Sequence, residues 1–118
     1  ITKRVLGEVQ AYCFDNKIDL RVAIMPVKED VYASALPGLF SAQEQAELKP
    51  FQENLGYIHQ DLASFLTAEN ISFVDLKPAL ETALKTHIIY PASDGHPNGA
   101  GYEVAAKAMF DAFAQPAS

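Results

Sequence analysis

The chain has 118 residues, a formal net charge of −6 and a hydrophobic fraction of 49%. This length fits one domain, and the apolar content argues against disorder. An acidic surface without a Lys/Arg cluster repels phosphate, which argues against nucleic acid as a partner and against docking on anionic membranes. No apolar run approaches the roughly 20 residues that a membrane span needs.

The ends and the single cysteine say little about the compartment. Cys13 cannot form an internal disulfide, so the compartment stays open, with a periplasmic or extracellular location slightly favoured over the cytoplasm. No signal peptide is visible, and the chain enters a helical pattern directly after Ile1. We therefore expect a longer gene product, with any targeting segment upstream.

The first third of the chain predicts a helix, a strand and a long loop. Residues 3–16 carry an apolar stripe at helical spacing, formed by Val5, Leu6, Val9 and Cys13. A short apolar run over residues 20–25, ended by Pro26, reads as a buried strand of a parallel sheet. Residues 27–40 have no clean period and contain Pro37-Gly38, so we expect a loop.

A long helix is expected next. Ser41 and Glu44 have the spacing of a capping box, and the helical pattern behind them runs to about Thr67. Pro50 predicts a kink or a restart within it. The expected buried face consists of Leu55, Ile58, Leu62, Phe65 and Leu66.

The last third alternates short apolar segments with helices. Residues 71–75 predict a second strand, and Pro78 suits the first turn of a short helix that ends at Leu84. Residues 88–90 form an extended segment that leads into a loop over 91–97, and a final helix covers about 99–114.

This order of elements implies a parallel sheet with helices on both faces, in which strands 20–25 and 71–75 are adjacent and parallel. Two strands and an extended segment make a thin sheet with an open apolar edge. We therefore expect this sheet to be completed by strands outside these 118 residues.

The chemistry-bearing stretch runs from Tyr90 to Tyr102 and contains one acid and one histidine, Asp94 and His96. If this segment is extended, residues i and i+2 point the same way, and the carboxylate can orient the imidazole as a general base. Pro97 and Asn98 would end the loop and start the helix. An ordinary polar loop with a solvated histidine explains the same residue types, and residue types alone leave both interpretations open.

Three segments resemble a known family. The string DGHPNGAGYEVAAKAM is similar to the C-terminal block of SGNH/GDSL hydrolases. RVAIMPVKEDVY and ISFVDLKPAL resemble the segments that precede this block in a bacterial branch that acylates or deacylates exopolysaccharides and cell surfaces. The resemblance implies a three-layer α/β/α flavodoxin-like fold, of which residues 1–118 would be the C-terminal part of a single domain.

The resemblance also implies roles for single residues. His96 looks like the catalytic base and Asp94 like its orienting acid. The commoner family spacing, D-x-x-H, would place the acid at Ser93, but a branch with D-x-H exists, so Asp94 is preferred. The family's nucleophile and oxyanion segments have no match here and would lie upstream.

The alternative to this expectation is a nucleophile within the chain. The serines are Ser34, Ser41, Ser64, Ser72, Ser93 and Ser118. None has a G-x-S-x-G or G-D-S context, and only Ser34, in the expected loop, stays open as a nucleophile. Cys13 on an apolar helical stripe is expected to be a core residue.

Other candidates have simpler explanations. Lys28 and Tyr32 follow the first strand, where α/β sheets place ligands, and are candidates for substrate binding. A solvated lysine and a packing tyrosine are the simpler explanation of the two residues. His59 and His87 are expected at the surface or partly buried, and Asp75 is expected to be a turn acid. No ligand spacing predicts a metal, and no cofactor is expected.

Three functions compete. The first is a serine-dependent ester hydrolase or O-acyltransferase acting on a small-molecule or carbohydrate ester, inactive without its missing part. The second is a non-catalytic binding or structural module with an idle Asp-His pair. The third, a receiver domain, needs acids at the first strand ends and a lysine in the late loop, where this chain has Asp94 and His96 instead.

Overall fold

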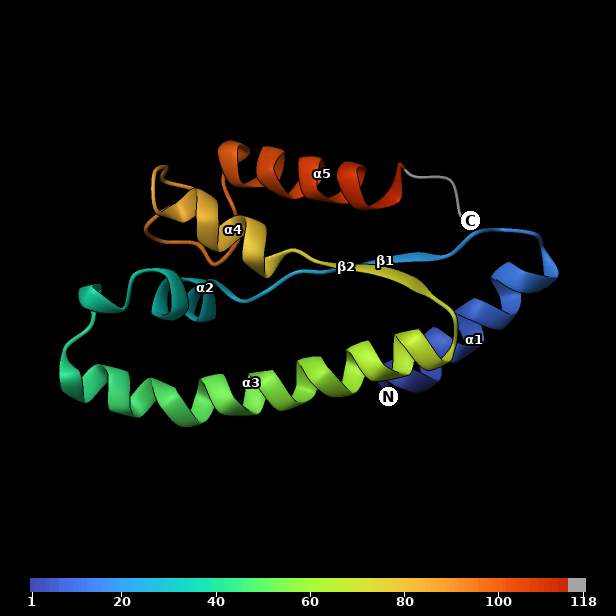
Figure 1. Cartoon of the computed structure of the whole chain (residues 1–118), viewed down its shortest axis with the longest axis horizontal. Helices are drawn as coiled ribbons and strands as arrows, with labels where there is room; N and C mark the ends of the chain where they lie inside the picture. The colour runs from blue at the N-terminus through green and yellow to red at the C-terminus, as the bar shows by residue number, and fades with distance from the viewer. Residues whose placement is uncertain (115–118) are drawn as a thin grey trace.

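The computed structural model describes residues 1–114 of the chain. Its elements in chain order are α1 (Thr2–Asp15), β1 (Arg21–Ile24), α2 (Lys28–Ala35), the 3₁₀ turn η1 (Pro37–Leu39), α3 (Ala42–Ala68), β2 (Ser72–Asp75), α4 (Lys77–Leu84) and α5 (Gly99–Phe113). Figure 1 shows the two strands running through the middle of the molecule, with α4 and α5 on one side and the long α3 with α1 on the other.

The sheet is parallel, as the sequence predicts. β1 pairs with β2 in a register that sets Arg21 opposite Ser72 and Ile24 opposite Asp75. The ladder is extended beyond the strands by the backbone N–H of Leu76, which donates to the carbonyl of Ile24 at 3.0 Å. The prediction that these two segments are adjacent and parallel is confirmed.

The expected fold class is wrong. Over the residues described, the chain is mostly helical and has one sheet of two strands, in place of a three-layer α/β/α flavodoxin-like fold. The segment 88–90 does not become a third strand because its acceptors are used locally. The carbonyls of Ile88 and Ile89 accept hydrogen bonds from the side chain and the backbone of Asn98, both at 2.8 Å.

The expected loop over 27–40 is also wrong, because it contains α2 and η1. Glu29 and Asp30 lie in the first turn of α2, where their negative charges interact favourably with the helix dipole. Val31 is fully buried, and its neighbours at helical spacing pack on the same core. The residues that face the core are Val31, Tyr32, Ala35 and Leu36. The packing of α2 on the core, and not a clean period in the sequence, sets this i, i+1, i+4, i+5 spacing apart.

Helix α3 begins as expected. The backbone N–H of Glu44 donates to Oγ of Ser41 at 3.1 Å, and the backbone N–H of Ser41 donates to Oε2 of Glu44 at 2.7 Å, so the capping box is confirmed. The helix continues through Pro50 without a restart. Pro50 and Ala46 are both exposed, so water can reach the carbonyl that loses its donor.

The hydrophobic core lies on the α4–α5 side of the strands. Its buried members are Val31, Leu76, Leu80, Leu84, Ile89, Tyr90 and Ala105. Strand β1 alternates between exposed and half-buried residues, so the expectation of a fully buried strand is wrong. Cys13 is the buried residue of α1, as expected, whereas Val5 and Val9 of the same stripe stay exposed. Within residues 1–114, no helix combines the length and the hydropathy that a bilayer crossing requires.

Candidate active site

The loop that carries Asp94 and His96 is closed at its base by Asn98. Besides the two bonds to the carbonyls of Ile88 and Ile89, the Asn98 side chain accepts from the backbone N–H of Gly101 at 3.0 Å and caps α5. Pro97 is buried beside it. Asn98 therefore ends the loop and starts the helix, as its position led us to expect, and its bonds to Ile88 and Ile89 also hold the two ends of the loop together.

Gly101 makes this close approach possible. A Cβ at this position would lie 2.5 Å from the carbonyl oxygen of Ile89 and 2.7 Å from Cβ of Pro97. Any larger residue would push the first turn of α5 away from the loop base. The glycine is therefore a requirement of the packing between the helix and the loop.

Asp94 and His96 are in direct contact. Nδ1 of His96 lies 2.7 Å from Oδ1 of Asp94, which is within hydrogen-bonding distance. The same carboxylate oxygen accepts the backbone N–H of His96 at 2.9 Å. The segment is bent at Gly95 and His96 and is not extended, so this turn, and not strand alternation, brings the two side chains together.

The electrostatics keep this carboxylate ionised. The hydrogen bond from the His96 backbone, then that from its side chain, lower the pKa of Asp94 below its ordinary value, and nearby Lys28 adds to the effect. An ionised carboxylate only accepts, so Nδ1 must carry the proton and Nε2 of a neutral ring is the free base. The His96 side chain is 81% exposed, which leaves Nε2 accessible.

Lys28 and Tyr32, the candidate substrate residues, contact the loop and its stem. Nζ of Lys28 donates to the carbonyls of Pro91 at 2.6 Å and Asp94 at 3.1 Å. It also lies 6.0 Å from the ring centre of Tyr32, whose ring is 6.0 Å from that of Tyr90. Lys28 is thus bound to the Asp94 loop, and Tyr32 packs between Lys28 and Tyr90.

Tyr90 anchors the stem of the loop in the core. Burial, followed by the nearby Tyr32 and Glu29, raises the pKa of Tyr90 above its ordinary value. Its hydroxyl is buried without a hydrogen-bond partner among residues 1–114. The tyrosine is therefore held at this place by its ring, which is 2% exposed, and not by a polar contact of its hydroxyl.

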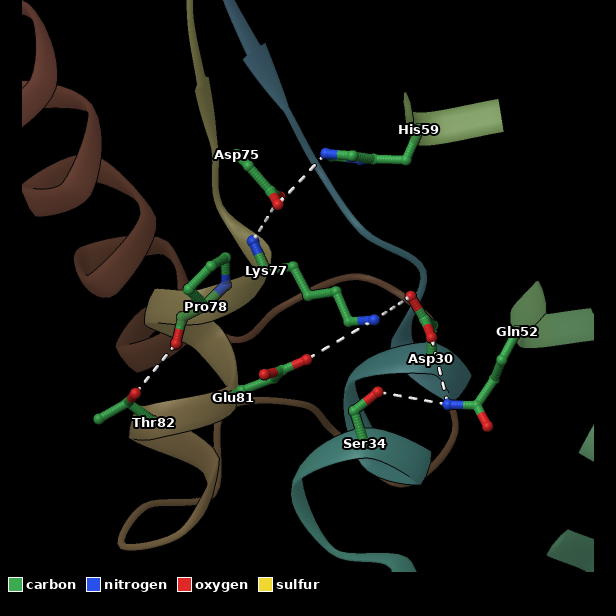
Figure 2. A network of polar contacts seen from close by, with 9 residues as sticks. All are labelled: Asp30, Ser34, Gln52, His59, Asp75, Lys77, Pro78, Glu81 and Thr82. Atoms are coloured by element: carbon green, nitrogen blue, oxygen red, sulfur yellow. Dashed lines mark hydrogen bonds and ion pairs between the residues drawn. The ribbon is translucent and has the colours of Figure 1, made fainter. Parts of the chain in front are cut away.

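The serine that stayed open as a nucleophile has another partner. Ser34 lies on α2, where its hydroxyl accepts from the Gln52 side chain of α3 at 3.3 Å (Figure 2). Over residues 1–114 no hydrogen bond joins His96 to a serine. Ser41 is the cap of α3, as expected, and Ser118 lies outside the described residues.

Sequence reasoning missed a second group of polar contacts at the carboxyl ends of the strands (Figure 2). His59 of α3 lies 3.3 Å from Oδ2 of Asp75, and Lys77 lies 2.8 Å from Oδ2 of the buried Asp30. Asp75 also accepts the backbone N–H of Lys77 at 3.0 Å, which confirms it as a turn acid. The contacts cross between helices far apart in sequence, so no local spacing could have indicated them.

The cavities lie away from the Asp94–His96 pair. One of about 360 Å³ sits between α3 and the strand ends, beside His59 and Asp75. Another of about 410 Å³ lies at the opposite end of the strands, by Arg21 and Phe113. In the part of the chain that the structure describes, no cluster of three or more His, Cys, Asp or Glu side chains has the geometry of a metal site.

Comparisons with known proteins add no family. No family model matches the chain, and neither a curated protein nor a solved structure matches it. The function is therefore inferred from the geometry of the site.

Proposed function

We propose that Asp94 and His96 form the acid–base pair of a serine-dependent ester hydrolase or O-acyltransferase of the SGNH/GDSL type. The 2.7 Å contact between Nδ1 of His96 and Oδ1 of Asp94 carries this proposal. It is supported by the exposure of His96 and by the lowered pKa of Asp94. In this proposal the nucleophilic serine and the oxyanion donors belong to a segment outside these 118 residues.

In the proposed reaction, Asp94 and His96 carry out the proton transfers. Nε2 of His96 would take the proton from the serine hydroxyl as the serine attacks the ester carbonyl, while Asp94 stabilises the imidazolium through Nδ1. The imidazolium would then give the proton to the departing alkoxide, leaving an acyl-serine. In the second half, His96 would activate water for hydrolysis or an acceptor hydroxyl for transfer. The resemblance favours a carbohydrate ester or a small-molecule ester as the substrate.

The test uses the protein in which this chain is joined to its serine-bearing segment. With p-nitrophenyl acetate as substrate, His96→Ala should lower kcat on the order of 10⁶-fold and Asp94→Asn on the order of 10⁴-fold. The base transfers the proton, whereas the acid orients and stabilises it, so the histidine variant should lose more. A fluorophosphonate probe should label one serine, and labelling should require His96.

The matched control is His87→Ala. His87 is also exposed, and its Nδ1 also contacts a neighbouring side chain, the hydroxyl of Thr86 at 2.8 Å. This variant should keep wild-type kinetics. The 118-residue chain alone should show no turnover, and a turnover that both Ser34→Ala and His96→Ala abolish would place the nucleophile within it.

The alternative is a non-catalytic binding or structural module with an idle Asp-His pair. The location of the cavities away from both side chains favours it. Wild-type kinetics in a folded His96→Ala protein would establish this alternative and reject the hydrolase.

A further inference from the structure

Lys28 makes an unusual set of contacts. It is the first residue of α2, four residues beyond the end of β1. Its ammonium group meets three carbonyls of one short stretch, those of Pro91 at 2.6 Å, Asp94 at 3.1 Å and Ala92 at 3.4 Å. An ammonium has three donors, so the loop uses its full hydrogen-bonding capacity.

The loop needs this tie because its two ends are fixed and its middle is not. At one end Ile89 and Tyr90 are buried in the core, and at the other Asn98 and the buried Pro97 close the base. Residues 92–96 between them are exposed. Exposed loop segments with few buried contacts open most easily.

Lys28 binds next to the carboxylate that orients His96. It bonds the carbonyl of Asp94 itself, so it fixes the backbone from which the carboxylate projects. The carboxylate then turns back to accept both N–H groups of His96. Rotation of the Asp94 peptide would break the lysine bond and move Oδ1 away from the ring.

We propose that Lys28 is a positioning residue that clamps the 91–94 carbonyls and thereby holds His96 in the tautomer protonated at Nδ1. Its catalytic consequence rests on the proposed function, whereas the clamp itself does not. Lys28 touches no substrate in this scheme. Its flexible stem and three rotatable donors suit carbonyls that point from different directions, which the planar fork of arginine cannot match equally well.

The first experiment measures the tautomer directly. Long-range ¹H–¹⁵N correlation spectra of the ¹⁵N-labelled 118-residue chain report which ring nitrogen of His96 carries the proton. Lys28→Met should shift the tautomer ratio away from Nδ1–H by roughly tenfold, the scale of a hydrogen bond to a charged group. Lys28→Arg should restore part of the shift. Lys85→Met, at an exposed lysine of the turn after α4, is the matched control and should leave the ratio unchanged.

A folding readout keeps the result interpretable. Amide spectra should show that Lys28→Met remains folded, and Lys28→Gln, which keeps two donors, should give an intermediate ratio. A wild-type ratio in folded Lys28→Met or Lys28→Gln overturns the clamp.

Activity separates the two proposals. If Lys28→Met shifts the tautomer but no esterase activity depends on His96, the clamp stands and the hydrolase fails. If His96 is essential and Lys28→Met changes neither the tautomer nor kcat, the hydrolase stands and the clamp fails.

Discussion

The two sides of the strands differ in how they use apolar residues. On the α4–α5 side, the core is continuous from Val31 through Leu80 to Ala105, and it includes Ile89 and Tyr90 at the start of the Asp94 loop. On the other side, the buried residues of α1 and α3 are Cys13 and Leu66 alone, and both helices expose large apolar side chains such as Ile58 at 55%. Helix α5 also exposes Tyr102 and Phe110, so the two sides differ in what they bury and not in whether they expose apolar residues. Helices α1 and α3 are joined there by an exposed ion pair between Lys3 and Asp61 at 2.5 Å.

The difference shows which half of the molecule these residues stabilise by themselves. Exposed ion pairs contribute little, whereas each fully buried leucine contributes a few kcal/mol. The side that carries the candidate site has its own core, so we expect the Asp94 loop to keep its geometry without further packing on α1 and α3. Four predictions test this contrast, in order of decreasing effect.

The largest effect should come from the core itself. Leu80→Ala removes a fully buried side chain of α4 and should lower the free energy of unfolding by about 2–5 kcal/mol. Ile58→Ala, on the open side of α3, should change it by less than about 0.5 kcal/mol. Urea denaturation followed by circular dichroism measures both. Equal losses would show that the two sides are packed alike.

Glycines should respond in opposite directions on the two sides. Gly101→Ala forces a Cβ against Ile89 and Pro97 and should cost about 1–3 kcal/mol of unfolding free energy. Gly56→Ala, within α3, meets nothing within 4 Å and should stabilise the protein by up to about 1 kcal/mol. Thermal unfolding of the two variants gives the signs, and stabilisation by Gly101→Ala would contradict the close approach.

The two helix caps should differ in what they control. Asn98→Ala removes the cap of α5 together with the bond to the Ile88 carbonyl, and should cost about 1–2 kcal/mol. Ser41→Ala removes a cap of similar strength from α3. Amide hydrogen exchange should show that Asn98→Ala speeds exchange in the Asp94 loop and α5. Ser41→Ala should speed exchange at the start of α3 alone. Faster exchange in the Asp94 loop of Ser41→Ala would show that the two caps do not act on separate parts of the molecule.

The smallest effect concerns titration. Asp94 and Glu44 both have lowered pKa values, mainly because a backbone N–H donates to each carboxylate, from His96 and Ser41 respectively. A carboxyl whose pKa is lowered on folding stabilises the protein above its unfolded pKa and loses that contribution as the pH falls through the folded value. For Asp94 this window lies below 3.8.

The ¹³C chemical shifts of the side-chain carboxyl groups, followed from pH 7 to pH 2, measure these two pKa values. Ser41→Ala keeps the backbone N–H but loses the side-chain hydrogen bond, so it should raise the pKa of Glu44 in part and leave that of Asp94 unchanged. Lys28→Met should raise the pKa of Asp94 and leave that of Glu44 unchanged. An ordinary pKa for Asp94 in the wild type would show that the His96 contact is not formed in solution.

The sequence alone determined the features that depend on neighbouring residues. The capping box of Ser41 and Glu44 and the cap at Asn98 were predictable, because a cap bonds backbone groups two or three residues away. The short contact between Asp94 and His96 belongs to the same class, although a bend and not an extended segment produces it. The parallel pairing of β1 with β2 followed from apolar runs separated by a helix.

Tertiary structure decided the rest. Helix α2 forms where the sequence suggested a loop, because its Val31 and Tyr32 find a core supplied by α4 and α5. The third strand does not form, because Asn98 takes the carbonyls that it would have used. Lys28 joins a loop 63 residues away, and His59 meets Asp75 across the strand ends. Such contacts depend on where whole elements pack, and residue spacing along the chain carries no record of that.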